Sequence, residues 1–560
     1  AMLLTASADN PFAPRNLEGV PEKDKDDENG NGKDAGAPKV EIDFDGLAAR
    51  VARAPIDFGN LGGLSATKEH LLFVGAPAFF YGRDIEPGAQ LHAYSFEDRE
   101  VFPITDKVSG YSLAAASKQI VVNQEGALNR FDIKKDEQQA KKADLDSLTA
   151  VRVRALEYEQ IFDEVWRRYR DHFYVENMHG YDWVALRDRY RPLLEHVAHR
   201  ADLNYLIGEM ISELNVGHAY VAGGDIAATE RSSDALLGAT FELDESAGLY
   251  RIGTIYAGQN EEDKYRSPLT EAGVNARPGD YVLAINGRSL TAGINPYSLL
   301  KGQGGRLLEL TLAGNARGKD RRSVLINPVA SENDLLYLRW VQENHARVTR
   351  ETEGRIGYLH IPDMGAPGIY EFTKWFYGQV RKQGMIIDVR GNGGGNVSQM
   401  VINRLARDLV FMGYDRGIDN LDTYPNVVFT GSLVALLDED SASDGDIFPA
   451  AFKALDLGPL IGKRSWGGII GITNLGPLMD GGSVYVPQFA TASAEGQWAI
   501  EGVGVEPDIE VDNPPEAVLR GEDPQLERAI EEALRRLRTN PGTLPPRPAD
   551  PVKTPGTDSR

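Results

Sequence analysis

The sequence of 560 residues contains no cysteine. This absence excludes disulfide bonds, thiolate metal sites and a cysteine nucleophile. It is also compatible with a reducing compartment, and we predict a cytoplasmic protein. Long apolar runs are missing as well, because no uninterrupted stretch could span a bilayer and residues 1–7 lack the basic region of a signal peptide. We therefore expect no membrane partner.

Positive charge is in deficit. The chain carries 60 Lys and Arg residues against 83 Asp and Glu residues, a formal net charge of -23. This balance argues against nucleic acid as a partner, because binding to phosphate groups requires a basic surface. An acidic chain is compatible with basic substrates, although the charge often serves only solubility. The length exceeds what one hydrophobic core organises, so we expect three or four domains.

Metal and nucleotide motifs are also absent. His196 and His199 have the spacing of a helical metal pair, but no third ligand lies nearby in the sequence. The glycine-rich run over 391–396 follows an apolar strand predicted over 385–390, yet its spacing fits neither a dinucleotide-binding nor a Walker loop. His360 lies in an apolar segment and is interpreted as a core residue. We therefore predict no metal and no cofactor.

Composition and periodicity together indicate a multidomain α+β protein. We predict a strand remnant and flexible acidic linker over 1–38, with the linker itself over 21–38; incomplete β-propeller blades or a sandwich over 39–142; a helical subdomain over 143–228; a β-rich domain over 233–328; an α/β core over 329–515; and a C-terminal helix with a disordered proline-rich tail over 516–560. Because the strands over 39–142 are too few for a closed propeller, we expect strand-like sequence to continue upstream of Leu3.

Several elements can be placed more closely. Strands are predicted over 71–74, 90–94 and 119–122. Apolar residues recur every three or four positions from Ala155 to Tyr169, which indicates an amphipathic helix. A second helix is predicted over 202–214 with Asp202 as its N-cap. Two more are predicted over 447–455 and 524–538.

The β-rich segment has good hairpin chemistry. It contains a Pro-Gly-Asp turn ending at Asp280 and an Asn-Gly turn at Asn286 and Gly287. The pattern resembles a PDZ domain, with the run from Leu237 to Phe241 near the loop that binds a peptide carboxylate. Such a domain adds a peptide strand to the edge of its sheet. The alternative is a β domain that serves only as a spacer.

The polar run over 440–446 precedes the helix predicted over 447–455 and contains Ser441 and Ser443. A serine at a helix N-terminus can cap the helix, or it can be a nucleophile with backbone N–H groups turned toward an oxyanion. His218, just past a helix end and among small residues, is a candidate base. Glu501 follows an apolar segment predicted as a strand, which suits a carboxylate that orients a histidine.

These features together resemble the tricorn proteases, relatives of the tail-specific serine peptidases. The resemblance covers about 150–511, and residues 40–140 resemble the end of the second tricorn propeller. The motifs that carry it are Gly217-His218-Ala219-Tyr220, Asp388-Val389-Arg390-Gly391-Asn392-Gly393-Gly394-Gly395, Ser441-Ala442-Ser443-Asp444-Gly445-Asp446 and Glu501-Gly502-Val503-Gly504-Val505-Glu506-Pro507-Asp508. The resemblance implies a peptidase that acts on oligopeptides or unfolded polypeptides. It also implies a hexamer that passes its products to aminopeptidases.

The resemblance assigns roles in the candidate triad. Ser443 falls on the nucleophile, whereas the lysine base of the tail-specific relatives falls on Gly468, which excludes a serine–lysine dyad. His218 is then the base and Glu501 its supporting carboxylate. Gly217 stands where the tricorn pattern has a serine that links the two, so a water or another hydroxyl would have to bridge them.

The same pattern implies the rest of the site. The N–H groups of Asp444 and Gly394 would stabilise the oxyanion, and Gly393 or Gly395 could take the second place in this register. Asp415 lies near the position of an acidic residue that favours basic side chains at the cleavage site. Two other functions stay open: a non-catalytic peptide-binding scaffold built on the PDZ-like and propeller segments, and an esterase-like hydrolase with the same triad.

Overall fold

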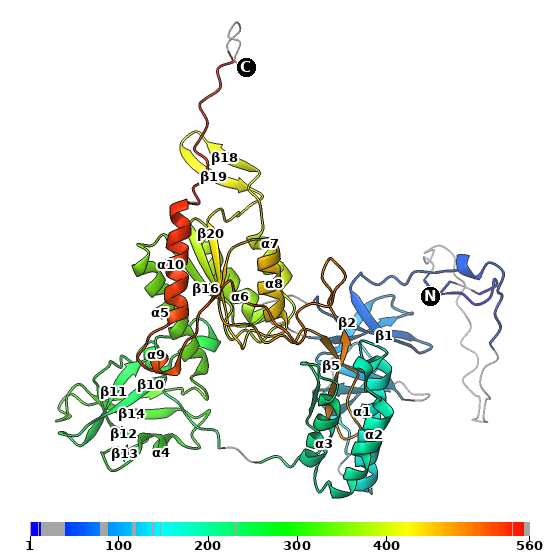
Figure 1. The fold of residues 1–560 in the computed structure, drawn as a ribbon. Coiled ribbons are helices and arrows are strands. Elements are labelled where there is room, and N and C mark those ends of the chain that lie inside the picture. The colour runs from blue at the N-terminus through cyan, green and yellow to red at the C-terminus, as the bar shows by residue number, and fades with distance from the viewer. Residues whose placement is uncertain are drawn as a thin grey trace. The chain divides into compact units, whose positions relative to one another are not determined.

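The computed structural model describes residues 2–8, 10–12, 40–78, 88–114, 119–136, 139–145, 147–149, 151–229, 232–539 and 541–553, without the side chains of 419–421. The linker predicted over 21–38 lies outside these residues. The chain divides into two units, Ala1–Val151 and Arg152–Arg560, each with its own hydrophobic core (Figure 1). Of the expected strand remnant at the N-terminus, Met2 forms a single bridge with Val51.

In its described residues, the N-terminal unit contains two antiparallel sheets of four strands each. Their bounds are β1 Asn60–Ala66, β2 His70–Ala76, β3 Gln90–Ser95 and β4 Val101–Thr105 in the first sheet, and β5 Val108–Leu113, β6 Gln119–Gln124, β7 Ala127–Asp132 and β8 Lys141–Lys142 in the second. The strands predicted over 71–74, 90–94 and 119–122 are confirmed as parts of β2, β3 and β6. Alternating apolar side chains such as Leu72 and Ile120 form the core of this unit.

The second unit begins with a helical subdomain. Its helices are α1 Arg154–His172, α2 Trp183–Tyr190 and α3 Arg200–Ser212, and its three-stranded sheet consists of β22 Gly471–Asn474, β23 Ser483–Phe489 and β9 Tyr220–Ala222. The predicted apolar face of α1 is confirmed, since Phe162 and Tyr169 are buried against Val484 and Val486 of β23. Two segments far apart in the sequence therefore form one core, and His218 lies between α3 and β9.

The cap predicted for helix α3 is wrong. The helix begins at Arg200, and Asp202 lies in its first turn. The cap is His199, whose Nδ1 accepts the Asp202 N–H at 3.4 Å, while the Asp202 carboxylate accepts the His199 N–H at 3.2 Å. This reciprocal pair is a capping box in which an imidazole replaces the usual hydroxyl.

In the part of the chain that the structure describes, no group of three or more potential metal ligands gathers.

The PDZ-like module is an antiparallel sheet in the order β10-β11-β12-β14-β15, with β13 paired to β12. Its elements are β10 Ala239–Asp244, β11 Leu249–Ile255, β12 Tyr281–Ile285, β13 Arg288–Ser289, α4 Pro296–Leu300, β14 Leu308–Ala313 and β15 Arg322–Ile326. The predicted Asn286-Gly287 turn is confirmed, and both residues have the positive φ that a tight hairpin requires. Strand β10 lies at the edge of the sheet.

The remaining core is a parallel sheet in the order β16-β17-β20-β21-β24. Its strands are β16 Ile356–His360, β17 Gly384–Asp388, β20 Ser432–Leu437, β21 Leu460–Gly462 and β24 Ile509–Glu510. All residues of β16, β17 and β20 are buried, as expected of parallel strands covered on both faces. The loops after these strands, including the glycine-rich run, therefore meet at one edge of the sheet.

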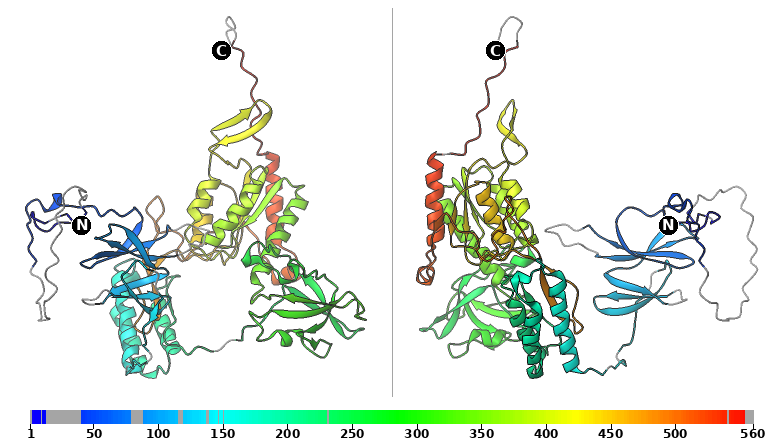
Figure 2. Two further views of the ribbon diagram at one scale, coloured as in Figure 1. Left: turned by 180° about the vertical axis from the view of Figure 1, so that it is seen from behind. Right: turned by 45° about the vertical axis from the view of Figure 1, so that its right-hand side comes forward.

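Helices cover the parallel sheet. They are α5 Asn333–Glu351, α6 Ala366–Phe376, α7 Ser398–Leu405, α8 Asp444–Ala454 and α10 Pro524–Thr539, and the short helix α9 Pro515–Leu519 precedes α10. A hairpin of β18 Phe411–Asp415 and β19 Ile418–Tyr424 extends from this core. Figure 2 shows α10 lying along one side of the sheet, where α5 and α10 share a core with its strands. The helix predicted over 524–538 is confirmed. The proline-rich tail contacts the hairpin, because the hydroxyl of Tyr414 on β18 donates to the Pro545 carbonyl at 3.0 Å.

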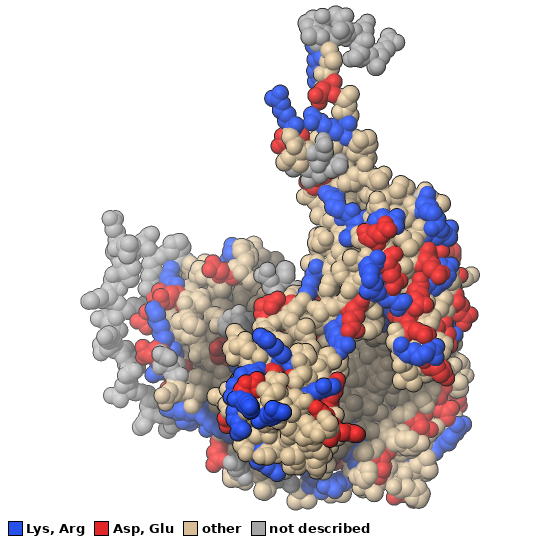
Figure 3. Space-filling view, turned by 90° about the vertical axis from the view of Figure 1, so that its left-hand side faces the viewer, with Lys and Arg blue, Asp and Glu red and all other residues tan. Residues whose placement is uncertain are grey.

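The surface carries both charges. On the face drawn in Figure 3, acidic and basic side chains are interspersed rather than separated by sign. Among the residues that the structure describes, no helix is both long and apolar enough to cross a membrane.

Candidate active site

Ser443 lies on a strained turn at the start of helix α8. The helix begins at Asp444, three residues before the predicted start, so Ser443 occupies the N-cap position. Its side chain makes no capping hydrogen bond, and its backbone angles of φ 59° and ψ -121° are rare for a residue with a side chain. The capping interpretation of this serine is therefore wrong. Strain of this kind persists where the surroundings fix the backbone, and it concentrates at functional sites.

Three backbone and hydroxyl contacts fix this turn. The buried Ser441 hydroxyl donates to the Val389 carbonyl at 2.9 Å. The Ala442 N–H donates to the Asn392 carbonyl at 2.8 Å, and the Trp466 N–H donates to the Ser441 carbonyl at 3.0 Å. Ser441 therefore belongs to the turn itself, and the serine turn is attached directly to the glycine-rich loop.

Asp444 contributes through both its backbone and its side chain. As the first residue of α8, it has an N–H with no acceptor inside the helix. Its buried carboxylate accepts the backbone N–H of Ser398 at 2.8 Å and the Ser398 hydroxyl. Ser398 begins helix α7, so the side chain of Asp444 joins the two helices while its N–H stays available. Sequence reasoning considered only the N–H.

The glycine-rich loop lies against Ser443 at Gly394. A Cβ added at Gly394 would lie 2.5 Å from the Ser443 Cβ and 2.7 Å from the Ala442 carbonyl oxygen, and its φ is +94°, so only glycine fits. The Gly394 N–H itself donates to Asn392 Oδ1 at 3.0 Å. Within the described chain no hydrogen bond uses the Gly393 N–H, and a Cβ at Gly393 would meet no atom within 4 Å.

His218 is nearly buried, with 8% of its surface exposed. Its ring makes edge-to-face contacts with Trp466 at 5.1 Å and with Tyr220 at 5.9 Å between ring centroids. Burial lowers the pKa of His218 below its ordinary value of 6.5, and the Glu501 carboxylate opposes this shift. The imidazole is therefore neutral at neutral pH, which is the form that a general base requires.

The three members of the predicted triad are not linked by direct hydrogen bonds. His218 Nδ1 is buried without a partner, and no hydrogen bond between described residues joins His218 to Ser443 or Glu501. Glu501 instead accepts three backbone N–H groups, from Gly217 at 3.0 Å, Ile469 at 2.7 Å and Ile470 at 3.1 Å. In this structure the carboxylate acts on His218 through its charge rather than through a direct bond.

The strand predicted before Glu501 is wrong. Residues 499 and 500 form no strand, and Trp498 forms a single bridge with Ala492. Ile500 has a φ of 72°, which is a severe outlier for a β-branched residue. The apolar residues thus form a tight turn that directs Glu501 toward the backbone of the loop over 469–470.

The space beside Gly217 is occupied by Trp466. A Cβ at Gly217 would lie 3.0 Å from Trp466 Cη2 and 3.1 Å from the Gly468 Cα, so a serine at this position would require the tryptophan to move. Gly217, Trp466 and Glu501 also line a cavity of about 400 Å³. The sequence-based prediction concerned only Gly468 of this loop.

Asp446 connects the two halves of the site. Its buried carboxylate, on helix α8, accepts the Gly467 N–H at 2.8 Å and the Ser465 hydroxyl. Burial raises the pKa of Asp446 above its ordinary value. Asp446 thus ties helix α8 to the loop that carries Trp466.

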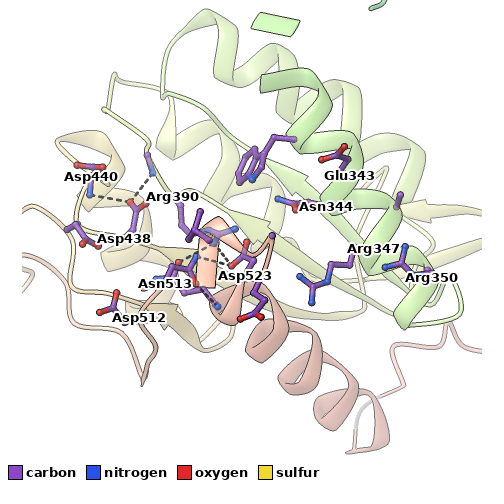
Figure 4. Close-up of a pocket in the computed structure, with 18 residues that line it drawn as sticks. Glu343, Asn344, Arg347, Arg350, Arg390, Asp438, Asp440, Asp512, Asn513 and Asp523 are labelled. Atoms are coloured by element: carbon purple, nitrogen blue, oxygen red, sulfur yellow. Dashed lines mark hydrogen bonds and ion pairs between the residues drawn. The ribbon is translucent and has the colours of Figure 1, made fainter. Parts of the chain in front are cut away.

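The Asp388-Val389-Arg390 motif supports the site rather than forming it. A cavity of about 830 Å³ lies beside α5, and Figure 4 shows Arg390 and Asp523 pointing toward one another in it. The buried Arg390 guanidinium donates to Asp388 at 2.7 and 2.9 Å and to Asp523 at 2.9 Å. His360, interpreted from the sequence as a core residue, is buried, and its Nε2 lies 2.9 Å from the Arg390 carbonyl oxygen. These contacts fix the start of the glycine-rich loop.

Asp415 lies at the end of β18, in the hairpin that extends from the core, and its side chain is exposed. Its carboxylate accepts the N–H of the neighbouring Arg416. No contact among the described residues brings Asp415 to Ser443 or His218, so the structure does not join it to the other predicted site residues.

Comparisons with known proteins define the class of this site. Residues 355–511 match the model of peptidase family S41, 154–212 match the tricorn protease C1 domain, and 235–331 match the tricorn protease PDZ domain. The parallel sheet and its serine turn thus form the core of an S41 peptidase.

Comparison with whole proteins identifies the family more closely than the domain matches do. The chain is 35% identical over 526 residues to tricorn protease homolog 1 of Streptomyces coelicolor, covering 91% of this chain and 48% of that protein. It is 32% identical over 519 residues to the tricorn protease of Thermoplasma acidophilum, covering 91% and 47%. A crystal structure of the tricorn protease matches with a TM-score of 0.79 and 30% identity, over 90% of this chain and 49% of that one. The chain belongs to the tricorn protease family, and it spans about half the length of the curated relatives it matches.

Proposed function

We propose that the chain carries the hydrolytic site of a serine peptidase that cleaves oligopeptides or unfolded polypeptides. The observation that carries this proposal is the conformation of Ser443. It stands uncapped on a strained turn at a helix N-terminus, with glycine-rich backbone packed against it. Esterase-like hydrolysis would use the same groups, and the family supports the peptidase.

The mechanism is acyl transfer. His218 takes the proton from the Ser443 hydroxyl as Oγ attacks the peptide carbonyl carbon. The oxyanion is stabilised by the Asp444 N–H and by an N–H of the glycine-rich loop. Family resemblance assigns the latter to Gly394, but its N–H donates to Asn392 Oδ1, whereas the N–H of Gly393 has no acceptor among the described residues. His218 then protonates the departing amine, and water hydrolyses the acyl-enzyme.

Glu501 stabilises the imidazolium that forms during the reaction. Because its carboxylate is held by three backbone N–H groups, it reaches His218 by its field, or through a water or hydroxyl in the cavity beside Gly217. Such a relay is weaker than a carboxylate bonded directly to the histidine, because part of the interaction is screened.

Family membership supports further proposals for the complete protein. The two four-stranded sheets have the strand number of propeller blades. A cytoplasmic hexamer that hands short products to aminopeptidases, and Asp415 as a residue favouring basic side chains at the cleavage site, stay predictions. Gel filtration with light scattering tests the hexamer.

The test of the activity is a fluorophosphonate probe together with turnover of a fluorogenic peptide. We expect the probe to label Ser443 in the folded protein and the Ser443→Ala variant to lose both labelling and turnover. A folded protein that is neither labelled nor active would instead support the non-catalytic peptide-binding scaffold.

A further inference from the structure

The loop of the PDZ-like module that should bind a peptide carboxylate already holds one. The N–H groups of Gly238 and Ala239 both donate to Glu332 Oε1, at 2.7 and 3.3 Å. Glu332 lies 94 residues beyond Gly238, outside the module, at the N-cap position of helix α5. Its side chain makes no capping hydrogen bond to its own helix. The carboxylate thus serves the loop and not α5.

This geometry imitates the end of a peptide ligand. PDZ-type modules capture a C-terminal carboxylate with consecutive backbone N–H groups at the end of an edge strand. The chain before Glu332 is also held at the start of the loop, because Leu236 and Val329 form an isolated bridge with hydrogen bonds of 2.8 and 3.0 Å. Burial raises the pKa of Glu332, while the two N–H groups oppose the shift. The desolvated carboxylate therefore depends on these two donors.

The edge strand beside the loop can accept a peptide strand. Strand β10 is the edge strand of its sheet and is paired only to β11 among the described strands. Phe241 on β10 and Tyr297 on α4 stand across from each other, with ring centroids 5.6 Å apart in an edge-to-face arrangement. This ring pair forms an apolar surface against which an apolar side chain at the end of a peptide can pack.

We infer that Glu332 is an internal ligand that closes the carboxylate-binding loop of the PDZ-like module, so that an external peptide with an apolar C-terminal residue binds by displacing it. A charge-assisted pair of hydrogen bonds has to be exchanged for an equivalent pair, so the external carboxylate gains little unless Glu332 is removed.

Displacement of Glu332 would affect α5 and, through it, contacts of the parallel-sheet core. Leu335, in the first turn of α5, lies close to the loop, since a Cβ at Gly238 would be 3.2 Å from Leu335 Cδ1. Further along α5, the Tyr337 hydroxyl lies 3.0 Å from His360 Nδ1, and His360 in turn contacts the Arg390 carbonyl before the glycine-rich loop. The N-terminal turn of α5 therefore touches both modules.

The experiment measures peptide binding by fluorescence anisotropy in the full chain. The probe is a fluorescein-labelled peptide with an apolar C-terminal residue, as the free acid and as the C-terminal amide. All proteins carry Ser443→Ala so that the probe is not cleaved, which makes the result independent of peptidase activity. We expect Glu332→Ala to bind the free acid about tenfold or more tightly than the parent, with no gain for the amide.

Two further variants complete the design. Glu332→Gln keeps a neutral acceptor and should bind the free acid with intermediate affinity, and it serves if Glu332→Ala fails to fold. Asp334→Ala removes an exposed carboxylate two residues away, which makes a 3.8 Å ion pair with Lys264, and should leave binding at the level of the parent. Hydrogen exchange of the segment over 237–241 should accelerate in Glu332→Ala and slow again when the free acid is added.

The inference is overturned if the parent binds the free acid as tightly as Glu332→Ala does. It is also overturned if the acid and the amide bind the variant equally, or if Asp334→Ala gains as much affinity as Glu332→Ala.

Discussion

The two sides of the candidate active site differ in how firmly they are held. On the Ser443 side, the turn is fixed by hydrogen bonds, including those of Ser441 and Asp444, and by Gly394, which no other residue can replace. The base side holds His218 by ring packing alone, with Nδ1 unpartnered among the described residues. The serine geometry is thus set by the fold itself, whereas the base depends on Trp466 and on the charge of Glu501.

The largest effect should come from the nucleophile. Ser443→Ala should reduce peptide turnover by roughly 10⁴-fold or more. The other hydroxyl of the turn, that of Ser441, cannot replace it because it is buried and donates to the Val389 carbonyl. Turnover of a fluorogenic peptide and intact-mass detection of the fluorophosphonate adduct provide the measurement. Turnover that persists in this variant would show that the firmly held turn is structural.

The next largest effect should come from the glycine that faces the serine. Gly394→Ala places a Cβ 2.5 Å from the Ser443 Cβ, at a φ of +94°, and should lower kcat/KM by about 10²-fold or more through displacement of the serine turn. Gly393→Ala is the matched control, since its added Cβ meets no atom within 4 Å. Gly393→Ala should lower kcat/KM by about 10-fold or less, a loss at least tenfold smaller than that of Gly394→Ala. Equal losses would contradict the tight contact at Gly394.

Removal of the carboxylate that acts on the base tests the looser side. Glu501→Gln should lower kcat/KM by about tenfold to a hundredfold, less than the roughly 10⁴-fold expected of a carboxylate bonded to its histidine. The pH profile adds a second signature. A neutral base loses activity as the pH falls through its pKa, which for His218 lies below 6.5.

The sign of the shift in the Glu501 variant follows from charge. The Glu501 carboxylate raises the pKa of His218, so its removal should move the acid limb of kcat/KM to still lower pH. Tyr220 and Glu501 are the titratable side chains that lie beside His218 or act on it. An acid limb that stays in place, or moves upward, would exclude His218 as the group that titrates.

The smallest effect should come from Gly217, which stands where the tricorn pattern has a serine. Gly217→Ser adds a Cβ 3.0 Å from Trp466 Cη2 and should reduce activity severalfold and stability by about 1 kcal/mol. In a Trp466→Phe background the same change should be tolerated, which a double-mutant cycle would show as a coupling free energy of about 1 kcal/mol. Independent effects on kcat/KM and thermal unfolding would mean that Trp466 does not take the place of the serine.

Local sequence patterns predicted local structure well. The strands at β2, β3 and β6, the apolar face of α1 and the Asn286-Gly287 turn all follow from periodicity or from the preferences of two residues. The errors arose where a pattern had two readings. Apolar residues before Glu501 formed a tight turn instead of a strand, and an imidazole capped α3 in place of Asp202.

The supporting contacts of the site could not be predicted in this way. Asp446 reaches the loop of Trp466, Asp444 reaches Ser398, and Glu332 reaches the PDZ-like loop. In the sequence each of these acidic residues is followed by helical residues, so its only expected role is to stabilise the helix N-terminus. Their partners lie on other elements, and periodicity carries no information on which elements meet.

The sequence by itself determined the chemistry that is available. With no cysteine in the chain and with Gly468 in place of a lysine, the sequence favours a serine nucleophile with a histidine base, and its motifs make Ser443 and His218 the candidates. The tertiary structure decided how these groups are held. Gly217 and Glu501 are 284 residues apart, and only the packing of the helical subdomain against β23 brings them within 3.0 Å. Contacts of that separation depend on the folded backbone, because local preferences act over a few residues and burial selects which distant surfaces meet.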